Sequence, residues 1–306
     1  AALVPVLTGL GRHDEAIAAG RAALALNPSQ PGLRHSLALT YLAAGHLSEG
    51  WAEFAHRWQA PGFPSHPRQL KAPLWDGKTS LAGKPVLVWR EQGVGDEITF
   101  LSALPDLIQL AGRVIVECSP KLVRLFARSF PQALVRSENR ETDPEVLGID
   151  AHLPMGDLFT HFRPSLSSFL DQDAYLVSDP QKTAAWKQRL LAQGLMPKIG
   201  LAWKSSLETP SRRLHYPGSL EALDPVLANK ECLFVILQPN ADPQEIEAAR
   251  QRTGAHILHL PEIDFMGDLD ETAALFTSLD KIISNGSANA FLAAALGTAT
   301  GIPLLK

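Results

Sequence analysis

Residues 84–118 read KPVLVWREQGVGDEITFLSALPDLIQLAGRVIVEC, and this stretch decides the fold class. Residues 84–90 form a short apolar run that ends at a glycine-containing turn, and residues 96–110 have the apolar spacing of a helix. Residues 113–118 are a second apolar run of strand length. A strand, a helix and a strand in this order predict a parallel sheet with helices packed against it.

The same alternation continues toward the C-terminus and then restarts. The first series goes on with a helix and two strands, at 121–129, 133–136 and 151–154. After an amphipathic helix at 180–193, the second series has strands at 198–203, 232–238, 256–260 and 281–284, and helices at 220–228, 242–252, 271–279 and 290–296. We therefore expect two α/β lobes in series, each with a doubly wound parallel sheet. A small ligand, such as a nucleotide, would bind at the carboxyl ends of the strands.

An internal repeat precedes the two lobes. The segment around Gly11 is echoed around Gly45, and the two glycines are 34 residues apart. This is the period of the tetratricopeptide repeat (TPR), a helix-turn-helix unit in which the glycine makes the turn. Ala16, Ala23 and Pro28 also fit the repeat. Such repeats bind peptides or proteins, and the alternative is that they act as a rigid spacer.

The second copy of the repeat departs from the usual pattern. Gly50 stands where alanine is usual, and its last helix carries Trp51, Phe54 and Trp58. We interpret this aromatic face as a capping helix that is buried against another domain, in preference to a ligand cage. The expected organisation is therefore helical repeats over 1–60, a proline-rich linker over 61–82, a first lobe over 83–178 and a second lobe over 179–306.

The composition narrows the class of protein. The chain has 306 residues, 45% of them hydrophobic, with 28 Lys and Arg against 32 Asp and Glu, a net charge of −4. A disordered chain is excluded, and the basic footprint of a nucleic-acid binder is missing.

The cysteines and the apolar segments bear on the location of the protein. Cys118 and Cys232 are too few for a disulfide framework, so we expect a cytoplasmic protein. Residues 282–305 carry no charge, but their glycines, asparagines and proline predict a strand, a turn, a helix and a strand instead of a membrane span. The first residues have no secretory pattern and read as the edge of a fragment.

The turn after the first predicted strand is one candidate site. Gln92, Gly93, Gly95 and Asp96 lie there, between a strand and a helix. Glycines allow backbone amides to approach a sugar or an anion. The sequence lacks the ending of a P-loop, and Ile98 stands where a dinucleotide fingerprint has glycine. Asp96 is either a general base or a residue that caps the helix, and spacing alone does not choose between them.

Cationic and small polar residues mark the second lobe. Lys204 follows a strand, Arg212 and Arg213 lie nearby, and all three are either cations that neutralise a diphosphate or solvated surface residues. A segment of hydroxyl and amide residues opens the last helix and makes a phosphate site plausible there. The segment contains Ser284, Asn285, Gly286, Ser287 and Asn289. Zinc-hydrolase, Cys-x-x-Cys and Gly-x-Ser-x-Gly motifs do not occur in the sequence, and we expect no metal and no cofactor.

Several motifs together resemble a known family. They are the TPR-like repeat, the segment from Gly50-Trp51 to Arg57-Trp58, Pro73 to Gly77 (PLWDG), Glu91 to Asp96 (EQGVGD) and Gly200 to Trp203 (GLAW). In this order they are similar to bacterial TPR-containing glycosyltransferase-like proteins, relatives of heptosyltransferases and of protein O-GlcNAc transferase. Residues 213–216 (RLHY) and 268–274 (DLDETAA) are most similar to the branch associated with flagellin glycosylation.

The resemblance implies a GT-B fold and the transfer of a sugar from a nucleotide donor to a hydroxyl group, on a protein recruited by the repeats. The first lobe becomes the acceptor side, with Asp96 as base and Gln92, Gly93 and Gly95 in the sugar loop. The second lobe becomes the donor side. The donor-binding residues are then Lys204, Ser205, Arg212, Arg213, His215, Gln238, Ser284, Asn285, Gly286, Ser287 and Asn289.

The chain also departs from this family. Gly286, Ser287 and Phe291 stand where many relatives have aspartate, threonine and histidine, so the alternative to an enzyme is a non-catalytic TPR adaptor on a degenerate GT-B scaffold. The helices that usually follow the last strand do not occur up to residue 306, so we expect the second lobe to be truncated in this chain. Fold likeness does not by itself establish chemistry.

Overall fold

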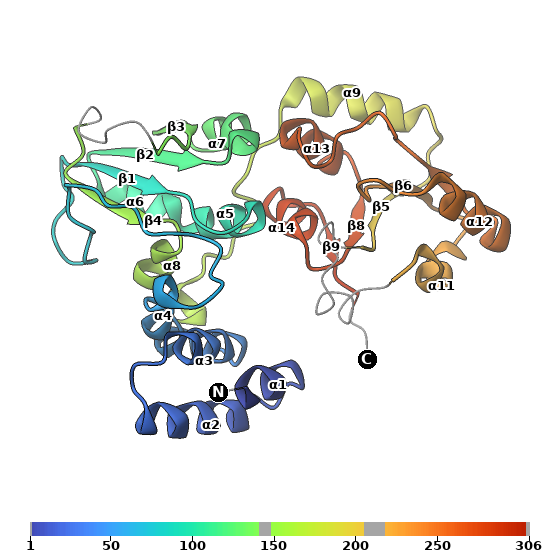
Figure 1. Ribbon diagram of the computed structural model, residues 1–306. Helices are drawn as coiled ribbons and strands as arrows, with labels where there is room; N and C mark the ends of the chain where they lie inside the picture. The colour runs from blue at the N-terminus through green and yellow to red at the C-terminus, as the bar shows by residue number, and fades with distance from the viewer. Residues whose placement is uncertain (1, 141–147, 205–217, 304–306) are drawn as a thin grey trace. The chain divides into compact units, whose positions relative to one another are not determined.

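The N-terminal part of the chain is helical. The computed structural model describes residues 2–140, 148–204 and 218–303 (Figure 1). Its first elements are α1 (Leu3–Gly9), α2 (His13–Leu26), α3 (Pro31–Ala43), α4 (Leu47–Phe54) and the short 3-10 helix η1 (Arg57–Gln59). Gly11 and Gly45 form the turns before α2 and α4, with φ of +72° and +83°. These left-handed values favour glycine, so both expected turns are present where the sequence repeat places them.

Helices α3 and α4 pack very closely at Gly50. A Cβ atom on residue 50 would lie 2.6 Å from Cδ2 of Leu42 and 3.1 Å from its backbone nitrogen. Real Cβ atoms do not approach other atoms so closely, so even alanine would push the two helices apart. This close approach is the physical reason why glycine replaces the usual alanine in the second copy.

The aromatic side chains that follow Gly50 pack against the first sheet and its helices: Trp51 and Phe54 are buried and Trp58 is half-buried. Trp51 Nε1 donates a hydrogen bond to the backbone oxygen of Arg163 at 2.9 Å, and its ring lies 5.6 Å from that of Phe159. The ring of Trp58 lies 5.5 Å from that of Trp89. The expected burial of this face is therefore observed, but within one compact unit that holds both these helices and the first sheet. That the last helix caps a TPR array stays a prediction.

The first sheet has four parallel strands in the order β3-β2-β1-β4. The strands are β1 (Pro85–Trp89), β2 (Arg113–Cys118), β3 (Ala133–Ser137) and β4 (Ala151–Pro154). Val86 of β1 is in register with Val114 on one side and with Ala151 on the other. The chain builds outward from β1 to β3 and then returns to the other side of β1. The strand order therefore reverses between β1 and β4, which is the switch point where open α/β sheets bind ligands.

The helix predicted over residues 96–110 is broken into three pieces. They are α5 (Val94–Phe100), the 3-10 helix η2 (Leu101–Ala103) and α6 (Leu104–Leu110). Pro105 is the second residue of α6, where its missing N–H costs little. The proline starts a new helix because it cannot continue the preceding one. The remaining elements of this unit are α8 (Asp157–Phe162) and the 3-10 helix η5 (Leu166–Ser168).

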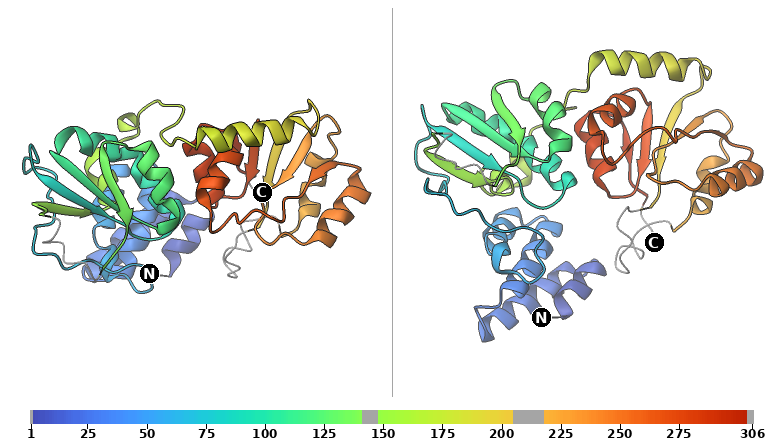
Figure 2. Two further views of the ribbon diagram at one scale, coloured as in Figure 1. Left: turned by 90° about the horizontal axis from the view of Figure 1, so that it is seen from above. Right: turned by 45° about the horizontal axis from the view of Figure 1, so that its top comes forward.

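The second sheet has five parallel strands in the order β7-β6-β5-β8-β9. Figure 2 shows this sheet, in yellow to red, from two further sides. The strands are β5 (Lys198–Ala202), β6 (Leu233–Ile236), β7 (His256–Leu258), β8 (Lys281–Ser284) and β9 (Thr300–Gly301). The helices of this unit are η3 (Pro120–Leu122), α7 (Val123–Ser129), α9 (Pro180–Leu191), η6 (Leu220–Leu223), α11 (Asp224–Leu227), α12 (Pro243–Thr253), α13 (Leu269–Phe276) and α14 (Ala288–Ala295). Here the order reverses between β5 and β8. With two parallel sheets and many helices, the expected α/β class with an N-terminal all-α part is confirmed.

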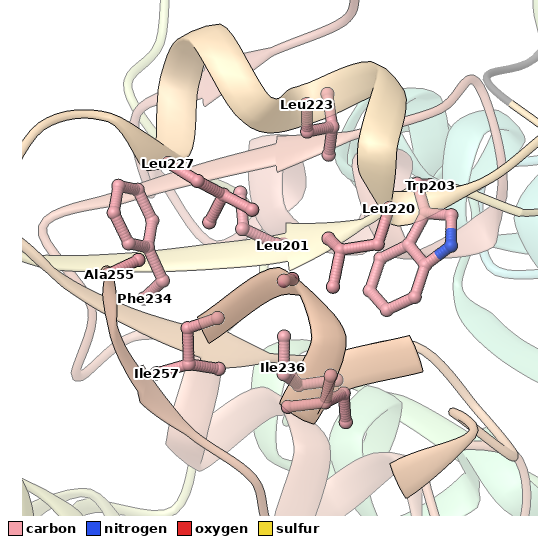
Figure 3. Packing of buried hydrophobic residues seen from close by; sticks show 11 residues of the cluster. Leu201, Trp203, Leu220, Leu223, Leu227, Phe234, Ile236, Ala255 and Ile257 are labelled. Atoms are coloured by element: carbon pink, nitrogen blue, oxygen red, sulfur yellow. The ribbon is translucent and has the colours of Figure 1, made fainter. Parts of the chain in front are cut away.

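One face of the second sheet is covered by η6, α11 and α12. Leu201, Phe234 and Ile257 from three neighbouring strands pack there against Leu220 and Leu227, as Figure 3 shows. Burying such side chains contributes about 1.5–3 kcal/mol each. This core holds the ends of β5 and β6 in place.

Helix α7 belongs to the second unit although it lies between β2 and β3 in the sequence. The two units comprise residues 1–118 with 132–171, and residues 119–131 with 172–306. Arg128 Nε on α7 donates a hydrogen bond to the backbone oxygen of Val177 at 2.9 Å, and Ser129 Oγ accepts one from its N–H at 2.9 Å.

In the described part of the chain, every helix is too short or too polar to cross a membrane.

Candidate functional sites at the carboxyl ends of the two sheets

The loop after β1 has a constrained backbone. Gln92 has φ of +60°, a conformation that is uncommon for a residue other than glycine, and its N–H donates a hydrogen bond to Ser65 Oγ at 2.7 Å. The next N–H, that of Gly93, donates to Asp96 Oδ2 at 3.0 Å. Two consecutive backbone groups of this loop are thus fixed by side chains.

Asp96 is the third residue of α5 and caps the helix. Its carboxylate accepts the N–H of Gly93, the residue that precedes the helix. Of the two roles that the sequence left open, capping is thus observed. The side chain of Asp96 is half-buried, and its role as general base stays a prediction. Gly95 lies in the first turn of α5, where its backbone oxygen accepts a bond from Thr99 Oγ1 at 2.9 Å.

A buried ion-pair network lies beside this loop. Arg57, from η1, makes a bidentate pair with Glu91: Nε lies 2.7 Å from Oε2 and Nη2 lies 2.8 Å from Oε1. Nη2 also lies 2.8 Å from Asp157 Oδ1. The side chains of Arg57 and Glu91 are 0% exposed. The aromatic rings of Phe54 and Trp58 enclose the guanidinium, with its central carbon 4.5 and 4.3 Å from the two ring centres.

Glu91 joins the two loops at the switch point of the first sheet. It follows β1, and its Oε1 accepts the N–H of Gly156, which follows β4, at 2.8 Å. A Cβ atom on residue 156 would collide with this oxygen, so glycine is required there. Burial raises the pKa of the Glu91 carboxyl, and the positive charge of Arg57 opposes this rise.

The edge of the second sheet is organised by Gln238. This buried residue follows β6, and its Oε1 accepts two backbone N–H groups that follow β5, from Trp203 at 3.0 Å and from Lys204 at 2.7 Å. The side chain of Lys204 is 33% exposed, and its Nζ lies 3.0 Å from Glu245 Oε2 on α12. Gln238 therefore fixes the backbone from which Lys204 extends, and Lys204 forms an ion pair.

The segment between β8 and α14 is tied to the same edge. The N–H of Asn285 donates to the backbone oxygen of Ala202 at 3.0 Å, and Asn289 Nδ2 donates to that of Leu237 at 3.4 Å. Ser284 is fully buried, and its Oγ donates to the backbone oxygen of Asn285 at 3.1 Å. Ser287 precedes α14. These bonds connect the ends of β5, β6 and β8 around the switch point of the second sheet.

Two buried donors lie at this switch point. Trp203 and Asn285 follow Ala202 and Ser284, which are partners in the register of β5 and β8, and both are at most 1% exposed. Trp203 Nε1 and Asn285 Nδ2 have no hydrogen-bond partner among the described residues. A buried donor without a partner costs about 1–3 kcal/mol, and the ring of Trp203 lies in the hydrophobic core that covers this face of the sheet (Figure 3). Gly286 is exposed, and a Cβ atom there would have open space around it.

The structure describes most of the residues that the sequence singled out. The candidate residues form two groups, one at the carboxyl ends of the strands of each sheet. The group of the first sheet contains Gln92, Gly93, Gly95 and Asp96, and that of the second sheet contains Lys204, Gln238, Ser284, Asn285, Gly286, Ser287 and Asn289. Ser205, Arg212, Arg213 and His215 lie outside the described residues. Among the described residues, no group of three or more His, Cys, Asp or Glu side chains could hold a metal ion.

Sequence reasoning missed Arg57, Glu91 and Glu245. Glu91 opens the EQGVGD motif and was available as a signal, since a carboxylate directly after a buried strand needs a partner. Its partner lies 34 positions earlier, and the sequence offers no rule that joins the two.

A curated protein and several solved structures are similar to this chain. No family model matches the sequence. Among curated proteins, Protein FlbA of Caulobacter vibrioides is 32% identical over 308 residues, which cover 94% of this chain and 51% of that protein. The chain thus spans about half the length of this curated relative.

Several glycosyltransferase structures are similar to the chain at low sequence identity. A glycosyl transferase family 9 protein from Veillonella parvula has 12% identity and a TM-score of 0.48, covering 74% of this chain and 81% of its own. The E. coli ADP-heptose lps heptosyltransferase II has 13% identity and a TM-score of 0.49, and the match covers 71% of this chain and 83% of that one. A Thermobaculum terrenum O-GlcNAc transferase mutant has 14% identity and a TM-score of 0.33, and the match covers 97% of this chain and 74% of that one. The fold class of this chain rests on its own strand order and not on these scores.

Proposed function

We propose that this chain is a glycosyltransferase that moves a sugar from a nucleotide-sugar donor to a hydroxyl group of a protein. In this proposal the two sheets are the lobes of a GT-B fold and the helices of residues 1–60 are TPR repeats that recruit the acceptor protein in the cytoplasm. The observation that carries the proposal is the cluster at the edge of the second sheet. There Lys204 and the segment from Asn285 to Ser287 gather at a switch point, where nucleotides bind in such sheets.

Lys204 would contact the donor phosphates. Its ammonium group has three N–H donors, so the ion pair with Glu245 is compatible with a further bond to a phosphate oxygen. The N-terminus of α14 would add positive partial charge beside Asn285 and Ser287. Ser205, Arg212, Arg213 and His215 would complete the donor site.

Asp96 would act as the general base. It would take the proton from the acceptor hydroxyl while the bond from that oxygen to the anomeric carbon forms and the bond from this carbon to the diphosphate oxygen breaks. Gln92, Gly93 and Gly95 would hold the acceptor or the sugar. No metal or cofactor takes part in this scheme, because the cations of the second lobe would stabilise the diphosphate leaving group.

A non-catalytic adaptor is the second candidate. It is favoured by two observations, that Asp96 caps α5 and that Lys204 is paired with Glu245, because both groups then have structural roles. The residues at 286, 287 and 291 also differ from those that the resemblance leads us to expect. An adaptor would keep the partner-binding helices and would bind no nucleotide sugar.

Thermal unfolding with UDP, GDP, CMP, ADP and their sugars separates the two candidates. A ligand at about one hundred times its Kd stabilises the folded state by about 2.7 kcal/mol and raises the Tm. We expect one nucleotide class to do so, and Lys204→Ala to weaken its binding by about tenfold or more. Lys187→Ala, at an exposed position on α9, is the matched control and should bind as the parent does.

Transfer is then measured with the nucleotide sugar of that class. Released nucleotide in the presence of a protein acceptor, lost in Asp96→Asn, supports the enzyme. The absence of a Tm shift with every nucleotide would favour the adaptor.

A further inference from the structure

Arg57 lies at the switch point of the first sheet, where it is bonded to residues that follow β1 and β4. The loops after β1 and β4 meet at the switch point of this sheet. The N–H of Gly156, in the loop after β4, donates a hydrogen bond to Glu91, in the loop after β1. In open α/β sheets this crevice receives the ligand. Here the guanidinium of Arg57 is bonded to both carboxylates that flank it, those of Glu91 and Asp157.

The guanidinium comes from outside the sheet. Arg57 lies in η1, directly after the helices of the N-terminal part, and is stacked between Phe54 and Trp58. Its Nη1 also donates to the backbone oxygen of Phe54 at 3.2 Å. Its position is therefore set by the helical part of the chain.

The carboxylate that Arg57 holds belongs to the loop proposed to bind the acceptor. Glu91 immediately precedes Gln92, whose φ of +60° is strained for a residue with a side chain. Such a conformation persists only where the surroundings impose it. Glu91 is fixed on one side of Gln92, and the bonds from Ser65 and Asp96 fix the backbone on the other.

We propose that Arg57 is the positioning residue of the loop 91–96: through Glu91 it holds the left-handed backbone of Gln92 and hence the orientation of Asp96. The inference rests on the proposed function only where it concerns catalysis.

Hydrogen exchange of the loop amides tests the positioning without an activity assay. The variants are Arg57→Met, which keeps most of the volume between the two rings, and Glu91→Gln, which keeps an oxygen for the Gly156 N–H. We expect the amides of Gln92 and Gly93 to exchange about tenfold faster or more in both. Arg57→Lys keeps the charge but loses the bidentate fork, and should lie between Arg57→Met and the parent.

Arg163→Met is the matched control. Arg163 is also a buried arginine of the first unit, paired with Asp106 at 2.8 Å and stacked on Phe169 at 5.7 Å, but its contacts do not include the loop. Its substitution should leave exchange at Gln92 and Gly93 close to that of the parent. Equal acceleration in Arg163→Met and Arg57→Met would mean general loosening and would overturn the proposal. Unchanged exchange in Glu91→Gln and Arg57→Met would also overturn it.

The kinetic measurement separates this proposal from the proposed function. If the parent transfers sugar, kcat should fall about tenfold or more in Glu91→Gln, while the Kd for the nucleotide stays unchanged because the donor residues lie in the second unit. An unchanged kcat would overturn the positioning role. If the parent transfers no sugar, faster loop exchange in the Arg57 and Glu91 variants still supports the positioning, and only the transferase proposal fails.

Discussion

Arg57 and Glu91 form a bidentate ion pair with neither side chain exposed, and the pair joins the helical part of the chain to the loop after the first strand of the first sheet. The pair is buried with a second carboxylate, that of Asp157, which is 16% exposed. Removing the arginine would leave Glu91 charged and unpaired in a buried position, which is the costly way to break such a pair.

We therefore expect Arg57→Met to lower the free energy of unfolding by about 3–5 kcal/mol. Adding Glu91→Gln to Arg57→Met should restore part of the loss, because a neutral amide costs less to bury than an unpaired carboxylate. Urea denaturation of both single variants and the double variant measures the coupling. Additive losses would show that the two side chains do not stabilise each other.

The contact between α3 and α4 gives a second prediction. Gly50→Ala should destabilise the chain by about 1–3 kcal/mol, since its Cβ would lie 2.6 Å from Leu42 Cδ2. Gly9→Ala is the control in α1, where a Cβ would contact nothing within 4 Å and should be neutral or slightly stabilising. If the two variants unfold at the same urea concentration, the close approach of α3 and α4 is not a constraint.

The edge of the second sheet gives a third prediction. Gln238→Leu would leave the N–H groups of Trp203 and Lys204 without their acceptor, at a cost of about 1–3 kcal/mol for each. The backbone before Lys204 would also lose its anchor, so the Tm shift by a nucleotide should shrink. Exposed Gln251→Leu on α12 is the control and should change stability by less than about 0.5 kcal/mol. A full nucleotide shift in Gln238→Leu would contradict the anchoring role.

His152 makes the stability depend on pH. Burial lowers the pKa of His152 on β4, and the charge of Arg68 lowers this pKa further. Its Nδ1 accepts the Nε1–H of Trp89 at 3.1 Å, which requires that this nitrogen carries no proton. In the unfolded chain histidine has a pKa of about 6.5, so below that pH the unfolded state binds the additional proton and is favoured.

Stability should therefore fall as the pH drops from about 7.5 to 5.5. His152→Asn, which keeps an acceptor for Trp89, should show a smaller fall, whereas His56→Gln at an exposed position should behave as the parent does. The Tm at each pH measures the difference. A His152→Asn profile parallel to that of the parent would assign the pH dependence to other groups.

Much of the candidate donor site could be predicted because it follows directly from strand ends. Lys204 and Asn285 directly follow predicted strands and Gln238 ends one, and parallel strands bring their carboxyl ends to one edge. What could not be predicted is how these groups are used locally. That Gln238 accepts two backbone N–H groups and Lys204 pairs with Glu245 depends on side-chain geometry between elements.

The order of most strands and helices and the turns at Gly11 and Gly45 follow from the amino-acid sequence alone, because periodicity and turn chemistry act over a few residues. The folded chain was needed to show that Leu42 leaves no room for a side chain at Gly50, that α7 packs with the second unit, and that Arg57 pairs with Glu91. These contacts join residues far apart in the chain or in different elements. Their energies depend on distance and burial in space, which no local pattern in the sequence records.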